Sequence, residues 1–271
     1  MIKIITLIDN VTYKEGLKGE HGLSFLVKTP DIKILFDTGQ SDQFIKNATL
    51  LGEDLTDVDY LVISHGHYDH TGGIQAFLEL NNKAKIIINE NAFEDKFSKS
   101  TGVIRPIGMS VAKDSIKRRV QLVTDSLELN TGIWVLGNII NQTTYETVNP
   151  KLLVSRESNL VSDTFEDELV LYLIHHHQLI IISGCAHHGI INTINAVEKH
   201  SGIDSIRLIT GGTHLNGAPN HRIEATVNDL KKMKIDSLMP NHCTGIAAYQ
   251  YLSEHLDFHV AYSSTGTMVT V

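Results

Sequence analysis

The chain has 271 residues, of which 42% are hydrophobic and 20% charged, a composition that provides a sizeable core and excludes intrinsic disorder. Lys and Arg number 23 against 31 Asp and Glu, giving a formal net charge of −8, which argues against nucleic-acid or membrane binding through bulk charge. No apolar run approaches the roughly 20 residues of a spanning helix. We expect no signal peptide, and with only two cysteines the reducing cytoplasm is the expected compartment.

The first third of the chain predicts short strands alternating with helices. Runs of β-branched and apolar residues bounded by turn residues predict strands at residues 3–8, 23–28, 32–36, 60–63 and 86–88. Apolar residues at helical spacing predict helices near residues 44–51 and 72–80. A histidine-rich loop, residues 64–71, lies between a predicted strand and the second helix.

The middle of the chain, residues 89–163, is less regular. It holds the only tryptophan, Trp134, and two stretches with strand character, residues 120–123 and 133–136. This segment is a candidate wall of a substrate site or a candidate contact in a homo-oligomer.

The last third predicts a hairpin followed by alternating helices and strands. The hairpin pairs residues 168–174 with 179–183 and turns at three consecutive histidines, residues 175–177. Helices are expected at 190–200, 224–233 and 246–256, and strands at 205–210, 237–239 and the C-terminus. Each half therefore runs from strands into alternating strand and helix, which predicts two packed sheets with helices outside, in a single domain of residues 1–271.

The most specific motif is the string His65-Gly66-His67-Tyr68-Asp69-His70. Imidazole and carboxylate groups are the ligands that suit zinc, iron or manganese. Four ligands within six residues are too crowded for one tetrahedral ion, so they divide into His65 with His67 and Asp69 with His70. The string predicts a site for one or two divalent metal ions rather than a polar surface loop.

Two single histidines, His187 and His242, have the same sequence context. Each follows an apolar strand, precedes a predicted helix and lies close to glycines that allow sharp turns. One further ligand per metal is what the first cluster lacks, so we expect both histidines to be ligands rather than ordinary loop residues.

With these motifs the chain resembles the metallo-β-lactamase superfamily, whose signature is HxHxDH followed by two distant single histidines. The resemblance implies an α/β fold, the αββα four-layer sandwich, with a dinuclear metal site at one edge of the paired sheets. It assigns His65, His67 and His187 to one metal and Asp69, His70 and His242 to the other. Zinc is the expected metal, with iron and manganese as alternatives. Asp37 matches the superfamily's first acidic position, where it would orient a ligand histidine; the alternative is an ordinary Asp-Thr-Gly turn.

A closer resemblance is to the subgroup typified by dihydropterin–ribofuranosylaminobenzene phosphate synthases. These enzymes join a dihydropterin methyl diphosphate to an aminobenzene ribotide and release pyrophosphate. The strings that carry the resemblance are residues 20–24, 36–39, 167–168, 184–187, 211–215 and 242–245. His21, within the first string, is the expected substrate-binding residue.

One departure from the superfamily concerns the metal-bridging Asp that most members place at the end of a later strand. The corresponding strand, residues 205–210, leads instead into Gly211-Gly212-Thr213-His214. His214 is therefore either a substitute ligand or, as we favour, a substrate-binding and catalytic residue together with Asp69. Without the bridging carboxylate, the second ion is expected to bind more weakly.

Several other side chains receive structural interpretations. Residues 175–177 are expected at a solvated turn, and His200, His255 and His259 on the surface, while His188 and His221 are unassigned. Cys185 and Cys243 are expected to be small buried residues, with thiolate ligation or redox pairing as alternatives.

Together these residues predict a metal-dependent hydrolase-type enzyme that acts on a phosphate- or diphosphate-bearing small molecule, by hydrolysis or by displacing pyrophosphate. The alternatives are an iron-dependent oxidoreductase on the same ligands and a binding protein that keeps the fold.

Overall fold

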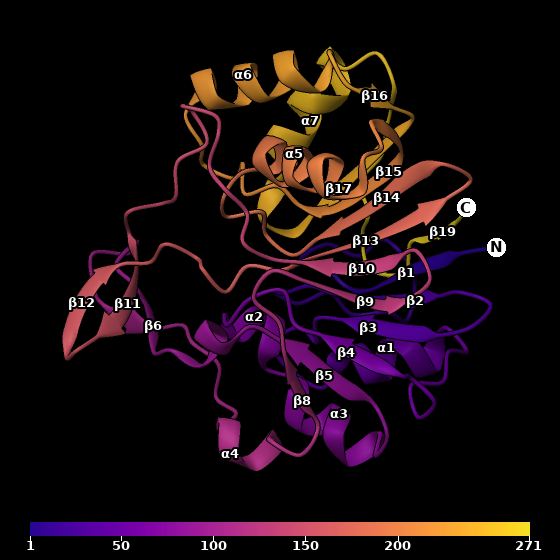
Figure 1. The fold of residues 1–271 in the computed structure, drawn as a ribbon, viewed down its shortest axis with the longest axis vertical. Coiled ribbons are helices and arrows are strands. Elements are labelled where there is room, and N and C mark those ends of the chain that lie inside the picture. Colours follow the sequence, from indigo (N-terminus) through magenta and orange to yellow (C-terminus); the bar gives the residue numbers. More distant parts are fainter. The chain divides into compact units, whose positions relative to one another are not determined.

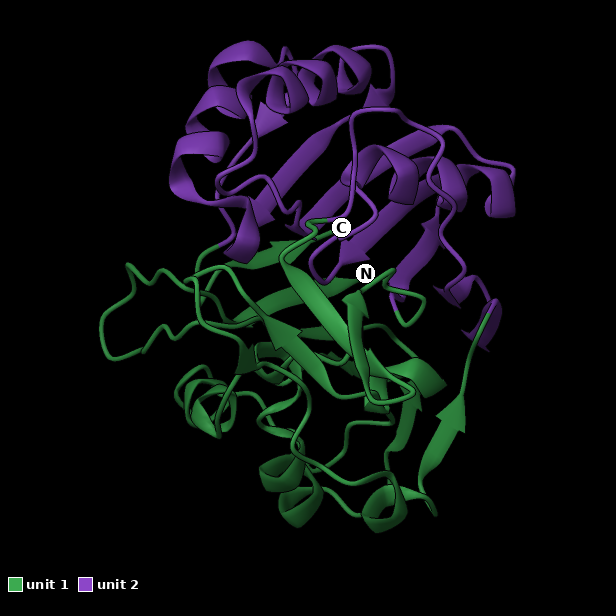
Figure 2. Cartoon of the chain, turned by 90° about the vertical axis from the view of Figure 1, so that its left-hand side faces the viewer, with its two compact units in different colours: residues 1–124, 149–167, 264–271 green, residues 125–148, 168–263 purple.

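The computed structural model describes all residues, 1–271, and the chain divides into two compact units (Figure 2). Unit 1 comprises residues 1–124, 149–167 and 264–271, and unit 2 comprises residues 125–148 and 168–263. The chain passes from one unit to the other at residues 124/125, 148/149, 167/168 and 263/264. Neither unit is one continuous segment of the chain. The single domain expected from the sequence remains a prediction.

Unit 1 contains a seven-stranded sheet in the order β19-β1-β2-β3-β4-β5-β8 (Figure 1). Its strands are β1 (Lys3–Ile8), β2 (Ser24–Lys28), β3 (Lys33–Phe36), β4 (Tyr60–Val62), β5 (Lys85–Ile88), β8 (Val120–Leu122) and β19 (Met268–Thr270). Helices α1 (Gln43–Leu50) and α3 (Ile74–Leu80) pack Phe44 and Phe77 into the core against this sheet. Strands β3 and β4 are parallel, so the residues that follow them meet at one edge of the sheet.

The central segment of the chain is more regular than its sequence predicts. Besides β8 and β10 (Ile133–Leu136), which match the two expected stretches, it contributes a small sheet in the order β12-β11-β6-β7 to unit 1. These strands are β6 (Lys96–Ser98), β7 (Arg105–Pro106), β11 (Leu152–Arg156) and β12 (Asn159–Ser162). They were not predicted because they are short and β12 is exposed along its whole length, so no alternating hydrophobic pattern marks it. Two short helices, η1 (Glu90–Phe93) and α4 (Lys113–Ile116), complete this part.

Unit 2 contains an eight-stranded sheet in the order β18-β17-β15-β14-β13-β10-β9, with β16 paired to β15. The strands besides β10 are β9 (Ser126–Asn130), β13 (Val170–His175), β14 (Gln178–Ser183), β15 (Ser205–Gly212), β16 (Lys234–Ile235), β17 (Ser237–Asn241) and β18 (His259–Val260). Helices α5 (Ile190–Ser201), α6 (Asn220–Leu230) and α7 (Ile246–His255) lie beside this sheet (Figure 1). Their buried apolar side chains, among them Ile194, Val227 and Leu252, form one core cluster with the sheet. None of the helices in the structure combines the length and apolarity that a bilayer crossing requires.

Two local features differ from or refine the expectations. Helix α6 begins at Asn220, four residues before the predicted start, because Pro219 at its N-cap sets the chain for a helix whose first turn is polar. The hairpin between β13 and β14 lies where it was predicted, and its turn consists of His176 and His177, which are exposed and have positive φ angles of 49° and 61°. His175, which was also expected in the solvated turn, is instead the half-buried last residue of β13 and pairs with Gln178.

Candidate metal centre

Four candidate ligands follow strand β4 in unit 1. His65 and His67 precede the short helix α2 (Tyr68–Thr71), which contains Asp69 and His70. All four side chains are buried. Gly66 permits this tight path, because a Cβ there would collide with the carbonyl oxygen of Ala92 in η1. The expected loop is thus partly helical and brings its ligand groups together within unit 1.

His65 and His67 are held as neutral imidazoles. The Nε2 atom of His65 lies 3.0 Å from the Nδ1 atom of His67. Burial, together with the neighbouring His70 and His67 rings, keeps the pKa of His65 well below its usual value. Burial likewise lowers the pKa of His67 to about 3. Neutral imidazole is the form that binds a metal ion, so this pair has the chemistry of a donor set.

Asp37 lies beside His70. It follows β3 with a φ of 59°, and its Oδ2 atom lies 2.7 Å from Nδ1 of His70. The Ser64 backbone N–H and hydroxyl also donate to this buried carboxylate, at 2.7 and 2.6 Å. When Nδ1 of His70 donates to Asp37, its Nε2 atom carries the lone pair, which is how a carboxylate orients a metal-ligating histidine.

His21, the predicted substrate-binding residue, lies next to Asp69. Its Nε2 atom is 3.1 Å from Oδ2 of Asp69, and its side chain is 54% exposed. The same Asp69 oxygen lies 3.9 Å from Nε2 of His70. Unit 1 therefore places the exposed imidazole of His21 directly against one of the candidate ligands.

A buried charge network that sequence reasoning missed supports the ligand loop. The Nζ atom of Lys96 lies 2.7 Å from Asp163 and 3.1 Å from Asp167. Asp167 also accepts a hydrogen bond from the Gly66 backbone N–H at 2.8 Å. The ring of Phe165 lies 5.4 Å from that of His67 and 5.2 Å from the Lys96 Nζ atom. Lys96 is 67 residues from Asp163 and 71 residues from Asp167 in the sequence, so no local spacing reveals the network. The only sequence signal was the string at residues 167–168, which contributes to the family resemblance.

The remaining candidates lie at one edge of the unit 2 sheet. Strands β14, β15 and β17 are mutually parallel, so the loops that follow them lie together. These connections carry Cys185, His187, His214, His242 and Cys243, the last two within the short 3₁₀ helix η2 (His242–Thr244). Ala186, His214 and His242 have positive φ angles of 53°, 51° and 49°. Such conformations are costly for residues other than glycine and cluster at functional sites.

Unit 2 brings its two cysteines and His214 together. Cys185, His214 and Cys243 each offer a ligand atom, all within 4.8 Å of one another. The rings of His187 and His214 have centroids 4.4 Å apart. The Nδ1 atom of His214 is buried and has no hydrogen-bond partner, whereas buried polar atoms are normally paired. His214 is therefore positioned to bind either a metal ion or a substrate. The sequence alone could not distinguish these two roles.

Glu168 holds the His187 loop, a role that sequence reasoning did not assign. Its carboxylate accepts hydrogen bonds from the backbone N–H groups of His187 at 2.5 Å and His188 at 3.0 Å. The Nδ1 atom of His188 lies 2.8 Å from the same carboxylate. Burial raises the pKa of Glu168, but these interactions outweigh it, so the pKa lies below the ordinary value. His188, left unassigned by the sequence, is a partner of Glu168.

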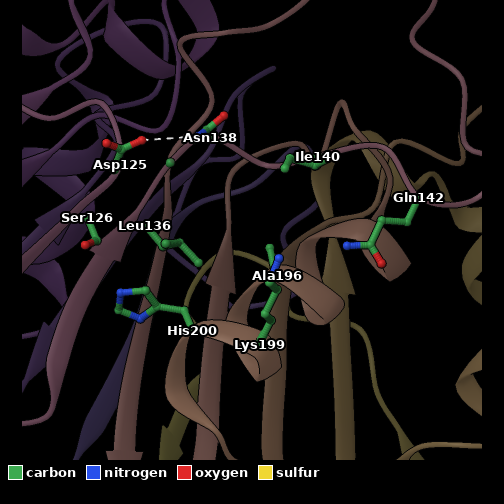
Figure 3. Close-up of a pocket in the computed structure, with 10 residues that line it drawn as sticks. Asp125, Ser126, Leu136, Asn138, Ile140, Gln142, Ala196, Lys199 and His200 are labelled. Carbon is green, nitrogen blue, oxygen red and sulfur yellow. Dashed lines mark hydrogen bonds between the residues drawn. The ribbon is translucent and has the colours of Figure 1, made fainter.

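Unit 2 also has a separate pocket along α5 (Figure 3). Its volume is about 290 Å³, and Leu136, Ile140 and Ala196 supply apolar lining while Lys199 and His200 lie at one side. Asp125 and Asn138 are hydrogen bonded at 3.2 Å. His200 was expected to be an isolated surface residue, but its Nδ1 atom lies 2.6 Å from the Tyr172 hydroxyl. None of the candidate metal ligands lines this pocket.

Comparison with known families identifies the class of protein. A family model described as the metallo-beta-lactamase superfamily matches residues 17–188, a span that contains the HxHxDH string and His187. The chain belongs to the metallo-β-lactamase superfamily and has its fold, as the sequence predicted.

Particular relatives confirm the resemblance to the synthase subgroup. The chain is 32% identical over 270 residues to the 7,8-dihydropterin-6-methyl-4-(beta-D-ribofuranosyl)-aminobenzene-5'-phosphate synthase of Methanocaldococcus jannaschii, covering 93% of this chain and 91% of that protein. It is 30% identical over 274 residues to an uncharacterized protein of the same organism, covering both in full. A crystal structure described as a metal-dependent hydrolase of the β-lactamase superfamily is similar with a TM-score of 0.87 and 28% identity, covering 100% of this chain and 99% of that one.

Proposed function

We propose that the protein is a metal-dependent enzyme that acts on a phosphate- or diphosphate-bearing small molecule. The observation that carries this proposal is the 2.7 Å contact between buried Asp37 and Nδ1 of His70, next to the neutral pair His65 and His67. A buried carboxylate that hydrogen bonds one ring nitrogen of a histidine is the arrangement that orients the other ring nitrogen toward a metal ion.

The ligand sets that we propose are those of the superfamily. His65, His67 and His187 would hold one ion, and Asp69, His70 and His242 a second ion. Nitrogen and carboxylate donors fit zinc, and they also fit iron or manganese. Strand β15 ends in Gly211 and Gly212 rather than in a carboxylate, so we propose that the second ion is bound more weakly than the first.

The bound metal would supply Lewis acidity that polarises a phosphate oxygen and lowers the pKa of a water molecule. The chain's own residues would orient the substrate and move protons. Asp69 and His21 are 3.1 Å apart, so a proton can pass between Oδ2 of the first and Nε2 of the second. His214 would donate a hydrogen bond to an oxygen of the phosphate or diphosphate group.

The finer choice between hydrolysis and transfer is part of the proposal. The relative named as a dihydropterin-linked phosphate synthase, 32% identical over nearly the whole chain, supports a transfer that releases pyrophosphate. The similarity to a structure described as a metal-dependent hydrolase supports attack by water. The phosphate in the name of the synthase relative supports a phosphate-bearing substrate for either reaction, and we propose that substrate class.

A substrate panel assayed with each metal tests the proposal. Phosphodiesters, thioesters, lactams and pterin diphosphates should be incubated with protein reconstituted with zinc, manganese or iron. Turnover of a phosphate-bearing member, lost in His67→Ala, supports the proposal, and turnover of none with any metal refutes it. Elemental analysis of protein made without added metal is the companion measurement. Iron in a coloured, oxygen-reactive site would favour the oxidoreductase instead.

A further inference from the structure

The sulfur of Cys185 lies among all the candidate ligands of unit 2. It is within 4.8 Å of a ring nitrogen of His187, a ring nitrogen of His242, a ring nitrogen of His214 and the sulfur of Cys243. The residue is 3% exposed and is not in a disulfide. Among the sets of three side chains close enough to bind one metal ion, Cys185 belongs to more sets than any other residue of unit 2.

The backbone of unit 2 allows the segments that carry Cys185 and Cys243 to come close together. Cys185 directly follows Gly184 at the end of β14, and the next residue, Ala186, has a φ of 53°. On the neighbouring strand β15, a Cβ at Gly212 would collide with the Cys243 sulfur and would lie 3.2 Å from the Cys185 Cα atom. Glycine at position 212 therefore lets the two cysteine-bearing loops approach each other.

Cys243 has a different part in this arrangement. Its thiol donates a hydrogen bond to the carbonyl oxygen of Cys185 at 3.4 Å. This contact involves the backbone of the Cys185 loop, whereas the Cys185 sulfur lies within 4.8 Å of ring nitrogens of His187 and His242. The two cysteines are therefore distinguishable by experiment.

We propose that Cys185 is a thiolate ligand of the metal centre, supplying the shared anionic donor that the end of β15 lacks. The proposal rests on the proposed function, which assigns His187 to one ion and His242 to the other. A single sulfur within reach of both histidines can serve both ions. Thiolate is a strong ligand for zinc and for iron. On binding, the S–H bond breaks, a sulfur–metal bond forms and the proton leaves to solvent.

X-ray absorption of the zinc-loaded wild-type protein is the first test, because it needs no variant. Cys185 ligation predicts a sulfur scatterer at about 2.3 Å from zinc. The same measurement on Cys243→Ser, the matched control with the other cysteine removed, should retain the sulfur shell. Cys185→Ser should lose it while still binding metal through its histidines.

Cobalt(II) titration gives an independent readout. The wild-type protein and Cys243→Ser should each show a near-ultraviolet sulfur-to-cobalt charge-transfer band, and Cys185→Ser should show only the visible bands of nitrogen and oxygen ligation. Metal binding below the thiol pKa should release an additional proton in the wild-type protein relative to Cys185→Ser. Circular dichroism checks that the variants are folded, and Cys185→Ala replaces Cys185→Ser if the serine variant is not.

The outcomes separate this proposal from the proposed function. Metal bound with only nitrogen and oxygen neighbours in the wild type would overturn Cys185 as a ligand and leave the metal enzyme intact. A sulfur shell that is lost in Cys243→Ser and kept in Cys185→Ser would also overturn it, by assigning the bond to Cys243. No metal binding at all would refute both proposals together.

Discussion

The Oδ2 atom of Asp37 lies 2.7 Å from Nδ1 of His70, and both side chains are fully buried. The other carboxylate oxygen of Asp37 accepts the backbone N–H of Ser64. The carboxylate therefore joins the ends of β3 and β4 and also fixes the ring of a candidate ligand. The Asp37 carboxylate accepts hydrogen bonds at both of its oxygens. An asparagine side chain at this position has only one oxygen and could keep only one of the two contacts.

Asp37→Asn tests this relationship. If the amide oxygen keeps the Ser64 N–H, its NH₂ group faces Nδ1 of His70 and forces the proton onto Nε2, the atom needed for the metal. We expect metal affinity to fall roughly 10–100-fold, the usual effect of losing such a partner. The fold should survive, because asparagine tolerates the positive φ of 59°. Competition with a chromogenic chelator measures the change.

The control for this variant is Asp57→Asn, which removes an exposed carboxylate paired with Lys33. It should leave metal affinity unchanged. Equal affinity in Asp37→Asn and the wild type would show that the contact with His70 does not orient a ligand.

His67→Ala should remove most of the bound metal and nearly all activity, because one ion would lose one of three protein ligands. The melting temperature measured with metal present should fall, since a metal that binds only the native state adds to its stability. His176→Ala, at the exposed hairpin turn, is the matched control and should leave bound metal and activity unchanged. Inductively coupled plasma analysis of both variants checks this, and unchanged metal content in His67→Ala would contradict the ligand assignment.

Lys96→Met should destabilise the protein strongly. It would leave the carboxylates of Asp163 and Asp167 buried without their cation, and removing one partner of a buried pair costs about 3–5 kcal/mol. Urea denaturation measures the loss in the free energy of unfolding. Lys113→Met breaks an exposed pair with Glu90 and should cost less than about 1 kcal/mol. Similar losses in the two variants would show that the buried network adds no special stability.

Much of the fold could be predicted because hydrophobic patterns mark its buried strands. Strand β1 (Lys3–Ile8) and strand β10 (Ile133–Leu136) have the predicted boundaries. The small sheet containing β12 could not be predicted, because an exposed four-residue strand carries no such pattern. Its existence depends on pairing with β11, a contact that no local signal encodes.

The candidate site was predictable to the extent that its ligands are close in sequence. The string from His65 to His70 is visible at once, whereas Lys96 and Glu168 act through partners that are far along the chain or are backbone groups. A lone lysine or glutamate has no spacing that reveals such a role. The central position of Cys185 likewise depends on the parallel order of β14, β15 and β17, which brings distant loops together.

We predict that the two compact units unfold together, as a single domain. The chain alternates between them at four points, residues 124/125, 148/149, 167/168 and 263/264, so neither unit can be cut out as one segment. Trp134 is the only tryptophan and lies in unit 2, so its fluorescence reports on that unit while far-ultraviolet circular dichroism reports on both. Coincident transitions, with equal calorimetric and van't Hoff enthalpies, are expected. Two separated transitions would contradict the single domain.

His214 is the residue for which the proposed roles differ most. It follows Gly211 and Gly212, has a φ of 51°, and its buried Nδ1 atom has no hydrogen-bond partner. If it contacts substrate, His214→Ala should retain its metal while turnover falls by roughly 10²–10³, the range for losing one oxyanion donor. If it is a ligand, metal stoichiometry should fall as well. We expect the first result, because the two three-residue ligand sets are complete without His214. Metal titration and steady-state kinetics on this one variant decide between the roles, and full retention of both metal and turnover would remove His214 from the site.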